Sequence, residues 1–464
     1  MRAMNITTQH SPTLIVAGRL PSDAAHWRYH AGMAEPEFTP VAGNGLLDRR
    51  LFLTRTLAFG AIAPMVHAAV PDEPWMKTPG APFTNYGSPS GYEREVVRWI
   101  SATDRAPGNG VSWSPLHELD GIVTPSGLHF ERHHNGVPQV DPAQHRLVVN
   151  GAVDHALEFS VEALLRYPRV SRFLVIECGG NSNAGWRERP IQTSAGYFHG
   201  LVSCSEWTGV PLRLLLDEAG VSAGADWIIA EGADAFGMTI SLPLAKARDD
   251  CLLALLQNGE RLRPEQGYPL RLLVPGWEGV LNVKWLRTLT LAREPVMARN
   301  ETARYTELQP DGSARMFTFV NAVKSLLTSP SAGMRLSGAG FYELSGLAWS
   351  GRGRVAKVEV SADAGSSWAE AALNEPVLPQ CFTRFRLPWH WNGEPCVLQS
   401  RATDETGAVQ PTRAALVGER GRHGYFHYNA IVSWQVDGDG ALTHTYVDDV
   451  AGAPASADPF DADW

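Results

Sequence analysis

The stretch Ser171-Arg-Phe-Leu-Val-Ile-Glu177-Cys178-Gly-Gly-Asn-Ser-Asn183 joins an apolar run to a loop of small and polar residues. A short apolar run bounded by turn residues is typical of a buried β-strand, which we expect over residues 171–177. Cys178 follows directly, and the two glycines after it allow a bulky group to approach the backbone closely. The stretch therefore predicts a thiol held rigidly at a strand end. From the spacing alone, a structural and a functional cysteine are equally good interpretations.

The segments around this strand predict a mixed α+β domain. Ser160 is suited to cap a helix over residues 161–167, and Pro211 and Gly220 bracket a second helix over residues 212–219. The other expected elements are a short helix over residues 93–100 and strands over residues 147–151, 227–230, 269–274 and 283–291. Because helices and strands alternate irregularly, the α+β class is favoured over a doubly wound parallel sheet.

The composition changes along the chain and divides it into four parts. Residues 1–69 form a leader, and residues 70–322 form the mixed domain, which begins with an arm rich in proline, glycine and aromatic residues. Residues 323–437 alternate between apolar and polar with turns about every ten residues, which predicts an immunoglobulin-like β-sandwich. Residues 438–464 are expected to be a solvated acidic tail, because from Asp437 onward there are seven aspartates and no lysine or arginine.

Charge and cysteine content exclude several function classes. The 464 residues carry a formal charge of −9 and no run of lysine or arginine, which argues against a nucleic-acid partner because phosphate contacts need a clustered basic face. The five cysteines include no C-x-x-C or C-x-x-C-H spacing, so we expect neither a zinc ribbon nor a covalently bound haem in this chain. Cys381 and Cys396 could pair after export, whereas Cys251, in an apolar run, is expected to pack in the core.

Residues 1–69 contain the pattern of an export signal. Arg49-Arg50 precede an apolar stretch over residues 57–66, and small residues follow before Val70. This resembles a twin-arginine signal, which implies a periplasmic protein that is exported already folded around a cofactor. The apolar stretch is too short for a membrane span, which must cross about 30 Å of hydrocarbon. The alternatives are a chance arginine pair before a core helix, or a translation start downstream of the long polar leader.

The loop Cys178-Gly-Gly-Asn181 resembles the cysteine loop of the sulfite oxidase family, and five other segments match that family in the same order. These segments are residues 130–134, 141–151, 207–212, 267–276 and 282–286. The resemblance implies a molybdenum cofactor, one per chain, in which a pyranopterin dithiolene holds the metal and Cys178 ligates it, since soft thiolate sulfur suits such a metal. It also implies that residues 70–322 are the molybdopterin-binding catalytic domain and that residues 323–437 are the dimerisation domain of a homodimer.

The resemblance assigns roles to five further residues. Arg132 would face the substrate oxyanion as a forked cation, and Tyr305 would donate toward an oxo group of the metal. His134, Arg271 and Lys284 would bind the cofactor, the two cations near the pterin phosphate. Without the resemblance, Arg132 would be interpreted as a surface arginine, Tyr305 as a packed loop aromatic, and the two cations as strand residues with solvated ends.

Two positions depart from the pattern of sulfite oxidases that act on free sulfite. Asn282 stands where many relatives have histidine, and Asn183 where animal sulfite oxidases have a second arginine. The Cys178 loop and residues 321–326 and 424–429 resemble instead the sulfur-oxidising (Sox) sulfane dehydrogenases of the same family. That resemblance implies oxidation of sulfane sulfur bound to a carrier protein, with a separate dihaem c-type cytochrome subunit as electron acceptor.

Three other functions stay open. Direct sulfite dehydrogenase activity is the main alternative, and a methionine-sulfoxide reductase of the same fold is disfavoured by the C-terminal sandwich. A cofactor-free secreted binding module is the alternative from another class. Hydrolase and nucleotide-binding functions have no specific support, because the sequence contains no G-x-S-x-G, H-E-x-x-H or Gly-rich phosphate-loop pattern.

Overall fold

The structure is a computed structural model, and it describes residues 40–48, 73–422 and 424–447. Arg49-Arg50, the apolar stretch after them and residues 448–464 lie outside the described residues. The export signal and the last part of the acidic tail therefore stay predictions. Within the described ranges, no helix is both long enough and apolar enough to cross a membrane.

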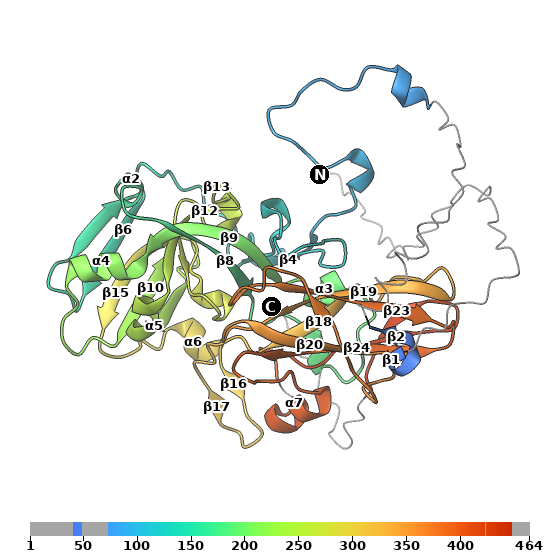
Figure 1. The fold of residues 1–464 in the computed structure, drawn as a ribbon. Helices are drawn as coiled ribbons and strands as arrows, with labels where there is room; N and C mark the ends of the chain where they lie inside the picture. Colours follow the sequence, from blue (N-terminus) through green and yellow to red (C-terminus); the bar gives the residue numbers. More distant parts are fainter. Residues whose placement is uncertain (1–39, 49–72, 423, 448–464) are drawn as a thin grey trace, which may run out of the picture. The chain divides into compact units, whose positions relative to one another are not determined.

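The first half of the chain contains two five-stranded sheets and short helices (Figure 1). The strands are β6 (Arg146–Gly151), β7 (Leu157–Ser160), β8 (Val170–Glu177), β9 (Val202–Pro211), β10 (Trp227–Gly232), β11 (Thr239–Pro243), β12 (Leu252–Gln257), β13 (Glu260–Arg261), β14 (Arg271–Leu273) and β15 (Leu286–Ala292). One sheet has the order β11-β10-β15-β6-β7, with β15 and β6 parallel, and the other has the order β13-β12-β9-β8, with β14 beside β12. This arrangement confirms the mixed α+β fold class.

The helices of this half are α2 (Val161–Leu164), α3 (Ala195–His199), α4 (Leu212–Ala219), α5 (Leu244–Asp249) and α6 (Arg299–Ala303). Helix α4 has the predicted bounds, and its buried residues Leu212, Leu215, Leu216 and Ala219 follow the spacing of one helix face. Helix α2 ends at Leu164 instead of residue 167, because the approach to Pro168 disfavours helical backbone.

A three-stranded sheet of β3 (Trp99–Ala102), β4 (Gly110–Trp113) and β5 (Glu131–His133) follows the arm within the mixed domain. The helix expected over residues 93–100 is wrong. A single 3-10 turn spans Gly91–Glu93, and β3 then pairs antiparallel with β4, placing Trp99 opposite Trp113. Pairing with a neighbouring strand satisfies the backbone of this segment, and local helical preference is too weak to compete with it.

The second half forms the β-sandwich. Its strands, with two from the N-terminal segment, are β1 (Pro40–Ala42), β2 (Leu46–Leu47), β18 (Lys324–Ser329), β19 (Gly340–Trp349), β20 (Val355–Ser361), β21 (Ala369–Glu370), β22 (Ala372–Leu373), β23 (Thr383–Trp391), β24 (Cys396–Asp404), β25 (Ser433–Val436) and β26 (Leu442–Thr445). One sheet has the order β1-β2-β23-β19-β18, with β22 also beside β23, and the other has the order β21-β20-β24-β25-β26. Between the halves lies the hairpin of β16 (Glu307–Leu308) and β17 (Ala314–Arg315), and helix α7 (Arg413–Arg420) follows β24.

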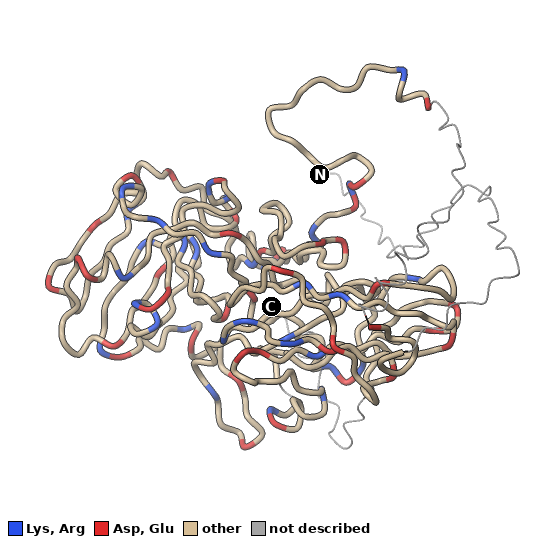
Figure 2. Tube along the Cα trace, viewed as in Figure 1, with Lys and Arg blue, Asp and Glu red and all other residues tan. Residues whose placement is uncertain are grey.

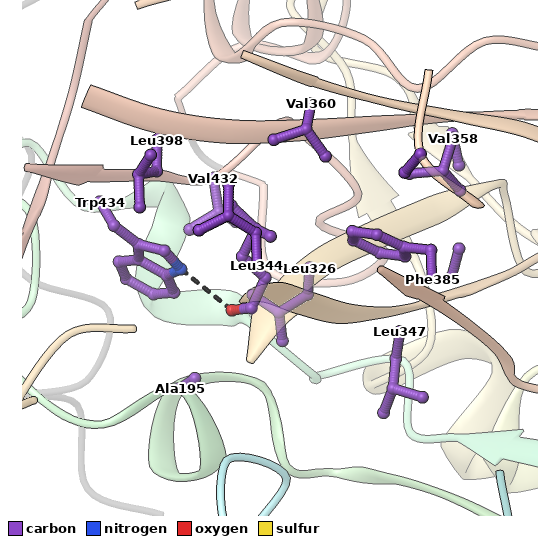
Figure 3. Packing of buried hydrophobic residues seen from close by; sticks show 14 of the residues in the cluster. Ala195, Leu326, Leu344, Leu347, Val358, Val360, Phe385, Leu398, Val432 and Trp434 are labelled. Atoms are coloured by element: carbon purple, nitrogen blue, oxygen red, sulfur yellow. Dashed lines mark hydrogen bonds between the residues drawn. The ribbon is translucent and has the colours of Figure 1, made fainter. Parts of the chain in front are cut away.

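Alternating apolar residues of the two sheets meet in the sandwich core, as Figure 3 shows for Leu326, Val360, Phe385 and Trp434 among others. The Trp434 indole is fully buried, and its Nε1 donates a 3.0 Å hydrogen bond to the carbonyl of Leu327, so the large ring is buried without losing its polar contact.

Two expectations for the second half are corrected. Residues 438–447 are not tail, because β26 pairs with β25, and Leu442 and His444 are each 3% exposed. The aspartates of this segment favour a solvated tail over a strand when the sequence is considered alone. Cys381 does not pair with Cys396: all five cysteines are free, and the sulfur of Cys381 lies 3.4 Å from that of Cys204. Cys251 is buried in the core as expected.

Candidate active site

Cys178 lies at the end of β8, in a loop whose backbone is fixed on all sides. Its amide donates to the carbonyl of Leu201 at 2.9 Å, and its carbonyl accepts from the amide of Asn181 at 2.8 Å. Gly179 packs closely against Glu278, because a Cβ there would lie 1.8 Å from Oε1 and would have to displace that carboxylate. Burial raises the pKa of the Cys178 thiol to about 11. Without a metal the thiol would stay protonated, whereas coordination would hold it as the thiolate.

The six site residues predicted from the sequence line one hollow beside this loop. They are Arg132, His134, Cys178, Arg271, Lys284 and Tyr305. They come from β5 and the residue after it, from the end of β8, from β14, from the loop before β15 and from the segment after α6. The structure therefore brings together residues that are far apart in the sequence. The individual role of each residue stays a prediction.

The two predicted cofactor-binding cations are deeply buried. Arg271 donates to the carbonyl of Asn282 at 3.2 Å and to Oε1 of Gln266 at 3.0 Å, and burial lowers its pKa to about 9. Lys284 donates to Nδ1 of His133 at 2.8 Å, and its pKa is lowered by burial and by the charge of Arg271. Such cations are costly to bury unless an anion compensates them.

Positive charge predominates in the hollow, although charges of both signs are interspersed along the rest of the trace (Figure 2). Arg132, Arg271 and Lys284 line it, and the acidic lining residues are Asp234 and Glu131. The carboxylate of Glu131 is already ion-paired to a neighbouring arginine outside the lining. This imbalance fits an anionic ligand such as a phosphate-bearing cofactor.

The imidazole of His134 is neutral in this setting. Burial, together with the charges of Arg132 and Lys284, lowers its pKa to about 3, and its ring stacks on Phe236 with centroids 4.1 Å apart. Arg132 itself is held by Asn109, whose Oδ1 accepts a 2.8 Å hydrogen bond from the guanidinium. A neutral ring next to a fixed cation suits binding of a polar cofactor without adding charge repulsion.

The Tyr305 ring stacks on Phe426 with centroids 5.2 Å apart, so the C-terminal domain supports this ring. Burial, and then the nearby Cys178, raise the pKa of the Tyr305 hydroxyl. The hydroxyl therefore keeps its proton at neutral pH and is available as a hydrogen-bond donor.

Tyr425 is a site residue that sequence reasoning missed. Its ring lies over Gly180, where an added Cβ would be 3.5 Å from it, and its hydroxyl hydrogen-bonds with Asn183. Burial, and then the neighbouring Cys178, raise its pKa to about 12. The backbone beside it is fixed, because the amide of His427 donates to the carbonyl of Gly179 at 2.8 Å. The sequence signal was the segment 424–429, which carried a resemblance but no role.

A metal bound here would need ligands beyond the protein. Within the described ranges, no three or more His, Cys, Asp or Glu side chains are grouped so that they could hold an ion by themselves. Cys178 is a single soft ligand beside a cationic hollow. This donor set fits a metal that arrives in a phosphate-bearing cofactor with sulfur ligands of its own.

Two family models match the chain. The "Oxidoreductase molybdopterin binding domain" model matches residues 134–299, and the "Mo-co oxidoreductase dimerisation domain" model matches residues 315–433. The first match contains Cys178 and the two buried cations, and the second covers most of the sandwich.

Similar proteins include enzymes of two named activities. A nitrate reductase [NADH] from Solanum lycopersicum is 28% identical over 68% of this chain and 39% of its own length. Mitochondrial sulfite oxidase from Mus musculus is 30% identical over 64% of this chain and 58% of its own length. The chain thus spans about four to six tenths of these curated relatives.

Among solved structures, the crystal structure of the sulfane dehydrogenase SoxCD from Paracoccus pantotrophus contains a chain of similar fold. The TM-score is 0.79 and the sequence identity is 41%, and the match covers 82% of this chain and 100% of that one. The likeness extends over both halves of the fold described above.

Proposed function

Because the chain belongs to the sulfite oxidase family of molybdenum-cofactor oxidoreductases, we propose that it is the molybdenum subunit of a sulfane dehydrogenase. In this proposal it oxidises sulfane sulfur bound to a cysteine of a carrier protein. The observation that carries the proposal is the 41% identity to a sulfane dehydrogenase chain that is matched along its whole length. Asn183 supports it, because that position lacks the second arginine expected of enzymes that bind free sulfite.

The residues of the hollow fit the molybdenum cofactor. Arg271 and Lys284 are buried cations that would neutralise the pterin phosphate, His134 is a neutral polar neighbour, and Cys178 is the thiolate donor. When bound, the cofactor supplies a two-electron acceptor at molybdenum and an oxygen that originates from water. The protein groups hold the cofactor and position the substrate.

The chain's own residues bind and orient the sulfur substrate. Arg132 is held by Asn109 beside Cys178, where its charge attracts an anionic sulfur group. Tyr305 retains its proton because its pKa is raised, and it donates a hydrogen bond where negative charge develops. Tyr425 and the Asn183 bonded to it narrow the approach to Cys178 from the side of the C-terminal domain.

The electrons leave this chain for a separate dihaem c-type cytochrome subunit, since the sequence contains no C-x-x-C-H motif for its own covalently bound haem. The enzyme is a homodimer through the sandwich, supported by the match to a dimerisation domain over residues 315–433. It acts in the periplasm after twin-arginine export, supported by Arg49-Arg50 and the apolar stretch that follows.

Oxidation of free sulfite is the second candidate, favoured by Arg132 and by the 30% identity to a mitochondrial sulfite oxidase. The two functions separate in one assay of the purified holoenzyme with its cytochrome. We expect cytochrome reduction with a carrier protein that holds sulfane sulfur on its cysteine, and little reduction with sulfite. Strong turnover of sulfite and none of the carrier would replace the proposal with sulfite dehydrogenase.

The same assay includes a matched pair of variants. Arg132→Gln should lower kcat/KM about a hundredfold, because the substrate anion loses a forked cation. Arg248→Gln, at an arginine whose surface partner is Asp217, should leave the rate unchanged. Equal rates for the two variants would show that Arg132 does not bind the substrate.

A further inference from the structure

Residues 40–47 form part of the C-terminal sandwich, although they precede the export motif. Strand β2 pairs antiparallel with β23, placing Leu46 opposite Trp389. Figure 1 shows β1 and β2 beside β23 at the edge of this sheet. Leu46 is 0% exposed and Leu47 is 3% exposed, and Leu46 belongs to the sandwich core. These two leucines are therefore buried as deeply as the core residues of the domain, whereas residues 40–45 are half-buried or exposed.

Three hydrogen bonds fix the turn between the two short strands. Nε1 of Trp389 donates to the carbonyl of Asn44 at 2.7 Å, and Nδ2 of Asn44 donates to the carbonyl of Ala362 at 2.7 Å. The amide of Gly43 donates to Oγ of Ser367 at 2.7 Å. Each bond joins residues that are at least 318 positions apart. The sandwich therefore binds both the backbone and a side chain of this segment.

Both glycines of the turn lie close to the sandwich, and Gly45 is required there. A Cβ on Gly43 would lie 2.1 Å from Oδ2 of Asp363. Gly45 has a φ of +86°, and a Cβ there would lie 2.0 Å from the carbonyl oxygen of His390. Since that neighbour is backbone, it cannot move aside cheaply. The sequence Gly-Asn-Gly-Leu-Leu is thus matched by shape and by hydrogen bonds to β23 and to the loop at residues 362–367.

The position of this segment in the sequence is unusual for a structural strand. Arg49-Arg50 begin two residues after Leu47, and the expected cleavage lies before Val70. The strand therefore belongs to the part of the chain that processing is expected to remove. Its binding site, in contrast, belongs to the C-terminal sandwich, which remains in the processed protein.

We propose that the edge of β23 in the C-terminal sandwich is a strand-addition site that binds residues 40–47 of the chain's own precursor and releases them after cleavage. The edge exists only once the sandwich has folded. Docking of residues 40–47 therefore places the twin arginines next to the C-terminal domain only when that domain is folded. After release, the edge of β23 around Trp389, beyond the part that pairs with β22, is open to other extended segments. This inference rests on the export signal and is independent of the sulfur substrate.

The test uses the exported holoenzyme and a dye-labelled peptide of residues 38–50. The N-terminus of the enzyme is first sequenced, and binding is then followed by fluorescence anisotropy. We expect cleavage after residue 69, saturable binding of the wild-type peptide, and slower amide exchange over residues 387–391 in the complex. Peptide variants leave the enzyme itself unaltered, so a folding defect cannot imitate their effect.

The Gly45→Val peptide should bind at least about tenfold more weakly, because its side chain would overlap backbone atoms. The matched Val41→Ala peptide should bind like the wild type, because Val41 is 48% exposed. No saturable binding, equal binding of the Gly45→Val peptide, or an exported enzyme that still carries residues 40–47 would each overturn the proposal. Activity measured on the same preparation tests the sulfane dehydrogenase function separately.

Discussion

Lys324 of β18 donates a 3.0 Å hydrogen bond to the carboxylate of Glu177, the residue directly before Cys178. The same ammonium group donates to Oγ of Ser182 at 2.7 Å, and Nε1 of Trp349 donates to the other carboxylate oxygen at 2.7 Å. The ion pair is almost fully buried, with the Lys324 side chain 1% exposed. Lys324 and Trp349 of the sandwich thus hold the cysteine loop, which begins after Glu177, from both of its ends.

Removing one partner of this pair should destabilise the fold. Lys324→Met leaves the buried Glu177 carboxylate uncompensated and should lower the free energy of unfolding by about 3–5 kcal/mol. The double variant Lys324→Met/Glu177→Gln should recover more than half of that loss, because the neutral amide needs no counter-charge. Urea unfolding of the three proteins measures both effects, and a single variant as stable as the wild type would contradict this account.

The buried histidine His129 should make stability fall in acid. Burial, and then the charge of Arg271, lower its pKa to about 3 in the folded protein, against about 6.5 in the unfolded chain. Between these values the unfolded chain binds more protons, so stability decreases as pH falls. One such group accounts for about 2 kcal/mol between pH 7 and pH 5. His129→Gln should reduce this loss of stability by about 2 kcal/mol in urea unfolding, because the other buried histidines still contribute, and the exposed His155→Gln should leave it unchanged.

Asn183 should control the choice between carrier-bound and free substrates. Asn183→Arg adds a second cation near Arg132 and Cys178, so kcat/KM for sulfite should rise about tenfold while turnover of the carrier falls. The neutral Asn183→Gln variant is the control and should leave the low sulfite rate unchanged. Steady-state assays with both substrates decide the matter, and an arginine variant that gains no sulfite activity would contradict the assignment.

The Tyr425 hydroxyl should matter for substrate positioning and little for folding. Tyr425→Phe keeps the ring over the cysteine loop but loses the bond with Asn183, so kcat/KM for the carrier should fall about tenfold, mostly through KM. Tyr92→Phe, at a tyrosine that is 96% exposed, is the matched control and should change nothing. An unaltered KM in the Tyr425 variant would place this hydroxyl outside the substrate path.

Elements of the fold were predictable where the apolar spacing of a segment and the residues that flank it indicate the same structure. Helix α4 has the bounds that its capping residues and apolar spacing indicate, and the alternation after residue 322 gives the sandwich. The failures have a common cause. The segment at residues 93–100 and the strand β26 are decided by pairing with the adjacent strands β4 and β25, which the composition of each segment alone does not reveal.

The candidate site was predictable in part for the same reason. Cys178 was visible because a buried strand ends in a Gly-Gly loop, and its five companions came from an ordered resemblance. Lys324 and Tyr425 had only weak signals, since each reaches the cysteine loop from the other domain. The contact of residues 40–47 with Trp389 had no signal, because nothing in a leader sequence indicates a strand of a distant sheet.

Ligation of molybdenum by Cys178, in a cofactor held by this hollow, can be measured by metal analysis. Molybdenum per chain and the number of sulfur neighbours of the metal are measured in the exported wild-type enzyme and in Cys178→Ser. We expect about one molybdenum per wild-type chain and the loss of one sulfur neighbour in the variant. Folded, exported enzyme without molybdenum, or a variant with an unchanged sulfur shell, would contradict it.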